Sequence, residues 1–157
     1  MILSADTNLF LYAANPRSPN YADARKFFAD QANGSNRFFL CGLVLVEIYM
    51  QLRNPAVFSV TRTPAEAALF CDRLRKNPNW EFCDYEPIVA IPMCQWAATT
   101  SGCFRQIIDA RLAFTLRHHG VTHFATANVE HVSDFVEQLS SIALVAKKWF
   151  LVDSRSN

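Results

Sequence analysis

Glu47 lies in an unusual place for a charged side chain. The segment 43–50 around it is otherwise apolar or aromatic, and the only polar residue one helical turn away is Gln51. A glutamate among apolar neighbours is rarely buried unless it is paired or bound to a metal ion. The alternative is a narrow solvent-facing stripe that Glu47 shares with Gln51. The pattern therefore makes Glu47 a candidate for chemistry but does not exclude a surface role.

Asp109 raises the same question further along the chain. On a helix its face is shared by Leu112, Ala113 and Leu116, which follow at three, four and seven residues. An aspartate on such a stripe needs a partner. A salt bridge to Arg105, one turn earlier, would be one explanation, and a role in a functional site is the other.

Asp6 is a third candidate, placed between an apolar run and the start of a helix. An aspartate there is often only a helix cap, and Asn8 has the same simple explanation. If Asp6 joined Glu47 and Asp109, each pair of charges at about 4 Å would repel by roughly 4 kcal/mol at an effective dielectric near 20. Raised pKa values or bound cations relieve such repulsion. Oxygen ligands suit Mg²⁺ or Mn²⁺, which can activate water for phosphodiester hydrolysis.

The elements that must position these acids alternate between strands and helices. Strands are predicted at 1–5, 38–40, 80–83 and 122–126, with two edge strands at 142–145 and 150–152; helices are predicted at 9–14, 20–32, 44–52, 63–76, 88–99, 104–119 and 130–139. Thr63 and Glu66 predict a capping box, and Gly120 a helix end. Such alternation predicts an α/β fold with a parallel sheet covered on both faces. Ligands bind beyond the carboxyl ends of such strands, where Asp6 and Asn128 fall.

Length and composition favour one globular domain. The chain has 157 residues, of which 51% are hydrophobic and 18% charged, so we expect a single domain over 1–153 and a polar tail at 154–157. The net charge of +1 gives no global signature of nucleic-acid binding, so any RNA contact must come from a local basic patch. The chain has five cysteines but no C-x-x-C pair, and its sequence shows neither a secretory leader nor a run long enough to span a membrane. We therefore expect a cytoplasmic protein.

Four segments, in the right order, resemble the motifs of PIN-domain proteins. The resemblance is carried by 5–8 with the following 9–13, by 45–49 with 52–55, by 108–113 with 118–122, and by 124–129. The second of these is similar to the second acidic motif of VapC-like toxins. No single motif is specific, but four in sequence identify the chain as a member of this family.

The resemblance implies a PIN-like three-layer α/β/α fold with a central parallel sheet of four to five short strands. It implies an endoribonuclease that depends on Mg²⁺ or Mn²⁺, acts as the toxin of a toxin–antitoxin pair, is inhibited by a VapB-like antitoxin and forms a homodimer. Its site would comprise Asp6 and Asp109 as ligands of the main ion, Glu47 completing the site or positioning water, Asn8 in support, and Thr126 and Asn128 at the rim. We expect the RNA to contact Arg53, Arg105 and Arg111.

Asn128 departs from the family pattern, because many PIN nucleases carry aspartate at this position. Asparagine keeps a carbonyl oxygen but loses a charge, which weakens a second metal site. The segment after it is also longer than is common in these toxins. Either His131 replaces the usual aspartate there, or Asp134 corresponds to it after an insertion. Asp134 or Glu130 then becomes the candidate for a fourth acid.

Two other functions are compatible with the same residues. A PIN domain without catalytic activity would bind RNA or an antitoxin without cleaving, and Asn128 motivates this alternative. A phosphohydrolase would use Asp6 as a covalent nucleophile. The Asp-Thr-Asn sequence is a poor match to the two-aspartate signature of haloacid-dehalogenase-like phosphatases.

Overall fold

The computed structural model of this chain describes residues 1–99 and 106–127. Its centre is a parallel sheet of four short strands in the order β3-β2-β1-β4. The strands are β1 (Ile2–Ala5), β2 (Arg37–Cys41), β3 (Glu81–Cys83) and β4 (His123–Ala125). Nearly every residue of β1 and β2 is buried, which explains why both strands are mainly apolar and do not alternate between apolar and polar residues.

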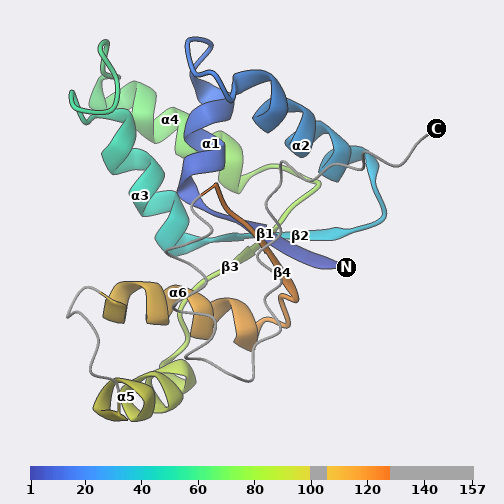
Figure 1. Cartoon of the computed structure of the whole chain (residues 1–157), viewed down its shortest axis with the longest axis vertical. Coiled ribbons are helices and arrows are strands. Elements are labelled where there is room, and N and C mark those ends of the chain that lie inside the picture. The colour runs from blue at the N-terminus through green and yellow to red at the C-terminus, as the bar shows by residue number, and fades with distance from the viewer. Residues whose placement is uncertain (100–105, 128–157) are drawn as a thin grey trace.

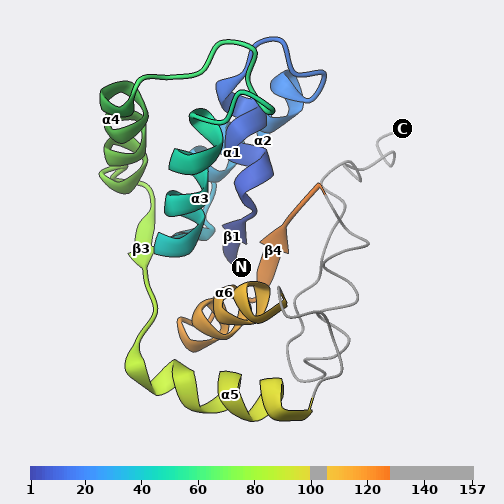
Figure 2. The same cartoon turned by 90° about the vertical axis from the view of Figure 1, so that its left-hand side faces the viewer.

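Helices cover both faces of the sheet and complete three layers. They are α1 (Thr7–Ala14), α2 (Tyr21–Asn33), α3 (Gly42–Leu52), α4 (Pro64–Arg75), α5 (Ala90–Thr99) and α6 (Gln106–His118), with a short 3₁₀ helix at Pro87–Val89. Figures 1 and 2 show α1 to α4 on one side of the sheet and α5 and α6 on the other. The α/β/α fold with a parallel sheet, predicted from the sequence, is therefore confirmed.

Local signals placed several helix ends correctly. Thr63 and Glu66 form the predicted capping box at the start of α4, with both reciprocal hydrogen bonds present. Gly120 follows α6 with a φ of 76°, a left-handed conformation that glycine adopts without strain. The predicted helix at 88–99 is divided into the 3₁₀ turn and α5. Pro92 is the third residue of α5, where the helix does not yet use the backbone N–H.

Other predictions fall outside the described residues. These are the start of the helix at 104–119, the helix at 130–139, the edge strands at 142–145 and 150–152, and the tail at 154–157. The domain limits therefore stay a prediction. Among the described helices, none is long and apolar enough to cross a membrane.

The core contains an aromatic cluster between the sheet and the helices α1 and α2. Phe10, Phe28, Phe38 and Trp80 contact one another with ring centroids between 4.6 and 6.4 Å apart. Such contacts fix the helices against β2 in addition to burying apolar area. The start of α1, directly after β1, is thereby held at the carboxyl edge of the sheet.

Candidate active site at the carboxyl edge of the sheet

Asp6 occupies the first position after β1, at the edge where the parallel strands end. Its backbone N–H donates to the carbonyl of Ala125 in β4 (2.8 Å). Its carboxylate oxygen Oδ2 accepts hydrogen bonds from Thr126 Oγ1 (2.9 Å) and from Asn8 Nδ2 (3.2 Å). Asp6 stands at the N-cap position of α1, yet its side chain makes no cap hydrogen bond. The carboxylate is therefore oriented toward the end of β4, and helix capping does not explain it.

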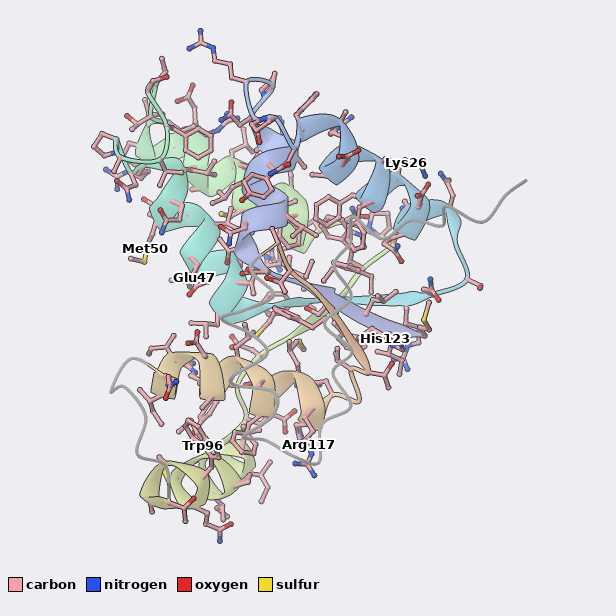
Figure 3. The ribbon with its side chains drawn as sticks, in the orientation of Figure 1. Lys26, Glu47, Met50, Trp96, Arg117 and His123 are labelled. Carbon is pink, nitrogen blue, oxygen red and sulfur yellow. The ribbon has the colours of Figure 1, made fainter. Side chains whose placement is uncertain are left out.

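Glu47 lies in the second turn of α3, and Thr7 is its hydrogen-bond partner. Thr7 Oγ1 donates to Glu47 Oε2 over 2.6 Å. Gln51, which offered the alternative explanation, accepts instead from Asn54 Nδ2 (3.2 Å). Figure 3 shows Glu47 in the half of α3 nearer the sheet, whereas Met50 points outward, where 61% of it is exposed. The half-buried Glu47 thus belongs to the sheet-edge cluster and not to a solvated stripe.

Asp109 reaches the same region from the opposite layer. It lies in the first turn of α6, which packs below the sheet in Figure 2 while α1 and α3 lie above it. Its negative charge raises the pKa of both Asp6 and Glu47, so the three carboxylates are near enough to act on one another. Arg105, the candidate ion-pair partner of Asp109, lies outside the described residues.

Burial is the largest cause of the raised pKa values of Asp6 and Glu47. Burial raises the pKa of Asp6; hydrogen bonds from Thr126, Thr7 and Asn8 oppose this effect without cancelling it. Burial also raises the pKa of Glu47, the hydrogen bond from Thr7 lowers it, and the charges of Asp6 and Asp109 raise it further. Holding Asp6 and Glu47 ionised is thus costly for the protein alone, and a bound cation would remove that cost.

The donor set fits a hard divalent cation. Every candidate ligand is a carboxylate, hydroxyl or amide oxygen, the type that Mg²⁺ and Mn²⁺ prefer. Within residues 1–99 and 106–127, no three Asp, Glu, His or Cys side chains are grouped so as to hold an ion together. Mg²⁺ commonly binds through one or two carboxylates and keeps several waters, so it does not require a third carboxylate.

Five of the sequence-predicted site residues lie at this edge: Asp6, Asn8, Glu47, Asp109 and Thr126. The predicted site residues Asn128, Asp134 and Arg105 lie outside the described residues.

Of the predicted RNA-binding arginines, Arg53 is exposed after α3 and donates to the Tyr49 hydroxyl (3.2 Å). Arg111, on α6, lies over the Tyr85 ring at 4.7 Å from its centroid.

Sequence reasoning missed Thr7, which contacts both Glu47 and Asp6. Thr7 directly follows Asp6 and begins a helix, a position at which a threonine attracts no notice. The sequence contains no signal for a hydrogen bond that spans 40 residues.

Comparison with known proteins agrees with this architecture. Residues 5–133 match the PIN domain family. The chain is 41% identical over 134 residues to Ribonuclease VapC24 of Mycobacterium tuberculosis (strain CDC 1551 / Oshkosh), an alignment that covers 85% of this chain and 91% of the relative.

Two solved structures share the fold at low sequence identity. The Mycobacterium tuberculosis toxin VapC20, described as cleaving the sarcin-ricin loop, has a TM-score of 0.59 and 14% identity, covering 78% of this chain and 86% of its own. VapBC2 from Rickettsia felis, bound to a DNA fragment from its promoter, has a TM-score of 0.56 and 16% identity, covering 85% and 92%. At these identities the likeness shows the fold alone.

Proposed function

This chain belongs to the PIN domain family and within it to the VapC ribonucleases, and we propose that it cleaves RNA with the acidic cluster at the carboxyl edge of its sheet. The observation that carries the proposal is the convergence of two half-buried acids, Asp6 and Glu47, with the charge of Asp109. Perturbed acids in a cluster that has no structural need for them are typical of functional sites.

Each residue has a distinct role in the proposed reaction. Asp6 and Asp109 would hold a divalent cation, with Thr126 and Asn8 fixing the Asp6 carboxylate by the hydrogen bonds described above. Such a cation supplies Lewis-acid stabilisation of the charge that develops on the phosphate. Glu47, held at one oxygen by Thr7, would use its second oxygen to complete the ligand shell of the cation or to orient the attacking water. Arg53 and Arg111 would attract the RNA backbone.

A direct test compares two substrates under two metal conditions. The protein is incubated with RNA and with a generic phosphomonoester, each with Mn²⁺ or with EDTA. We expect endonucleolytic products from RNA with Mn²⁺ only. RNA binding without cleavage would instead indicate a non-catalytic PIN domain, and hydrolysis of the phosphomonoester would indicate a phosphohydrolase that uses Asp6.

As a VapC protein, the chain is expected to act as a toxin with a VapB-like antitoxin, to form a homodimer and to work in the cytoplasm.

A cavity of about 330 Å³ between α1, α2 and α4 is a candidate site for an antitoxin segment. Its wall is mainly apolar and aromatic and includes Phe28, Phe70 and Trp80, with Arg25 and Asn77 as polar members. The lining therefore suits an apolar side chain.

Ala29→Arg should separate inhibition from catalysis. Ala29 is exposed on α2 and lines this cavity, so a long charged side chain there would fill the space without disturbing the core. We expect antitoxin affinity to fall by about tenfold or more, which corresponds to roughly 1.4 kcal/mol, while RNA cleavage by the free protein is unchanged. Ala68→Arg, at an exposed position of α4 that does not line the cavity, is the matched control. Unchanged antitoxin affinity in Ala29→Arg would exclude this site.

Asn128→Asp tests the metal requirement of the proposed site. Asparagine offers a neutral oxygen where aspartate would add a charge. We therefore expect one tightly bound metal ion in the free protein, and a second ion only with the RNA phosphate. Asn128→Asp should lower the Mn²⁺ concentration needed for half-maximal cleavage. If that concentration does not change while Asp134→Asn cripples cleavage, the fourth acid is Asp134 and our placement of Asn128 is wrong.

A further inference from the structure

Thr7 connects two acids of the site that are 41 residues apart in the sequence. Its hydroxyl donates to Glu47 Oε2 over 2.6 Å, and its backbone N–H interacts with the Asp6 carboxylate. Only 6% of Thr7 is exposed, so water has little access to replace this hydroxyl. Thr7 is thus in direct contact with the acids on α3 and at the end of β1.

The position of Thr7 in the fold makes its hydroxyl a rigid donor. It is the first residue of α1, and the first N–H groups of a helix have no partner inside the helix. The backbone N–H of Thr7 is therefore available to Asp6. The neighbouring Asp6 N–H is fixed to Ala125 in β4, so the sheet determines where α1 starts.

Glu47, by contrast, needs an external constraint. Its side chain has three rotatable bonds and extends from α3, a different helix from the one that carries Thr7. A hydrogen bond from a hydroxyl to a carboxylate is among the stronger kinds, and a separation of 2.6 Å is in the short range for it. This bond occupies Oε2 and restricts the direction in which Oε1 points.

We propose that Thr7 is a positioning residue that holds the Glu47 carboxylate in its working orientation beside Asp6. The proposal rests on the proposed function, since it assumes that Glu47 acts in the site. Thr7 touches neither substrate nor metal in this role; it acts through Glu47. Partners of this kind, one contact removed from a metal, typically contribute about 10- to 100-fold to metal affinity or activity.

Two substitutions distinguish the contribution of the Thr7 hydroxyl from that of its methyl group. Thr7→Val keeps the shape and removes the donor, whereas Thr7→Ser keeps the donor and removes the methyl group. We expect Thr7→Val to lower kcat for RNA by about 10- to 100-fold with KM little changed, and to weaken binding of Mn²⁺ alone by about tenfold. Thr7→Ser should recover most of both losses. A packing role would give the opposite order, with valine tolerated and serine impaired.

Thr115→Val is the matched control. Thr115 is also buried, with 1% exposure, and its hydroxyl also makes a short hydrogen bond, to the Arg111 carbonyl within α6 (2.7 Å). The Thr115→Val variant loses a hydrogen bond of similar length, but this bond does not involve a carboxylate of the site. We expect its Mn²⁺ affinity and kcat to match those of the unmodified protein once its folding has been verified by thermal melting.

A double-mutant cycle identifies the residue through which Thr7 acts. In a Glu47→Ala background, Thr7→Val should cause no further loss of Mn²⁺ affinity, because the group that it positions is already absent. Equal further losses in both backgrounds would overturn the proposal, as would unchanged Mn²⁺ affinity in Thr7→Val alone. If the unmodified protein binds Mn²⁺ but cleaves no RNA, the proposed function fails, and the Mn²⁺ measurements still decide the role of Thr7.

Discussion

Asp6→Asn is expected to abolish RNA cleavage and, at the same time, to raise the melting temperature of the metal-free protein. Burial raises the pKa of the Asp6 carboxyl group, and the nearby charge of Asp109 raises it further. The ionised form of Asp6 is therefore disfavoured in the folded state. Asparagine keeps an oxygen that can accept the hydrogen bonds of Thr126 and Asn8 but carries no charge. Without the charge we expect cleavage to fall by at least about 10²- to 10³-fold.

Asp72→Asn provides the matched control for this experiment. Asp72 lies on α4, where hydrogen bonds from Lys76 and Arg75 lower the pKa of its carboxyl group. The same substitution there should leave cleavage unchanged and should not raise the melting temperature. If instead Asp6→Asn lowered the melting temperature of the metal-free protein as a lost structural bond would, Asp6 would be a structural residue. The ligand role would then be refuted.

Adding Mn²⁺ is expected to raise the melting temperature, and by more at pH 7.5 than at pH 5. A cation that binds only the folded protein adds about 2.7 kcal/mol when its concentration is 100 times its Kd. For a chain of this size that corresponds to a shift of roughly 5–10 °C. Metal binding requires deprotonated carboxylates, so acid weakens the effect.

The metal-free protein should show the opposite dependence on pH. For Asp6 and Glu47 the folded-state pKa lies above the unfolded value, so between the two values the folded state holds more protons. The contribution of these groups to stability therefore falls as pH rises from about 4 through the folded-state pKa.

The pH-dependent contribution of Asp6 to stability is isolated by comparing thermal melts of the unmodified protein and Asp6→Asn, in EDTA and in Mn²⁺, across this pH range. Identical pH profiles of the melting temperature for the two proteins in EDTA would show that ionisation of Asp6 does not destabilise the metal-free protein. An absent Mn²⁺ shift at pH 7.5 would contradict metal binding at the site.

The layers of the fold were predictable because apolar strands and amphipathic helices leave clear patterns. The parallel sheet followed from their alternation, and Thr63 and Gly120 specified helix ends through local chemistry. Starts of helices were less accurate: α1 begins at Thr7 and α3 at Gly42, each two residues before the predicted start. The first turn of each of these helices directly follows a strand, and its few residues are too short a segment to show a helical periodicity.

The acids of the site were recognisable because a charge on an apolar segment is costly, and this cost is a local property of sequence. The hydrogen bonds that organise them were not. Thr7 and Glu47 meet only because α1 and α3 both begin at the carboxyl edge of the sheet, and Thr126 reaches Asp6 across the boundary between β1 and β4. Such contacts depend on strand order and register, which the pattern of residues does not determine.

Anomalous scattering from Mn²⁺ shows directly whether the acidic cluster at this edge binds a divalent cation. A crystal of the unmodified protein grown with Mn²⁺ should show an anomalous peak in contact with the carboxylates of Asp6 and Asp109, and a crystal of Asp6→Asn should lose that peak. A well-diffracting Mn²⁺ crystal with no peak beside Asp6 and Asp109, or with its only peak elsewhere on the molecule, would contradict the claim.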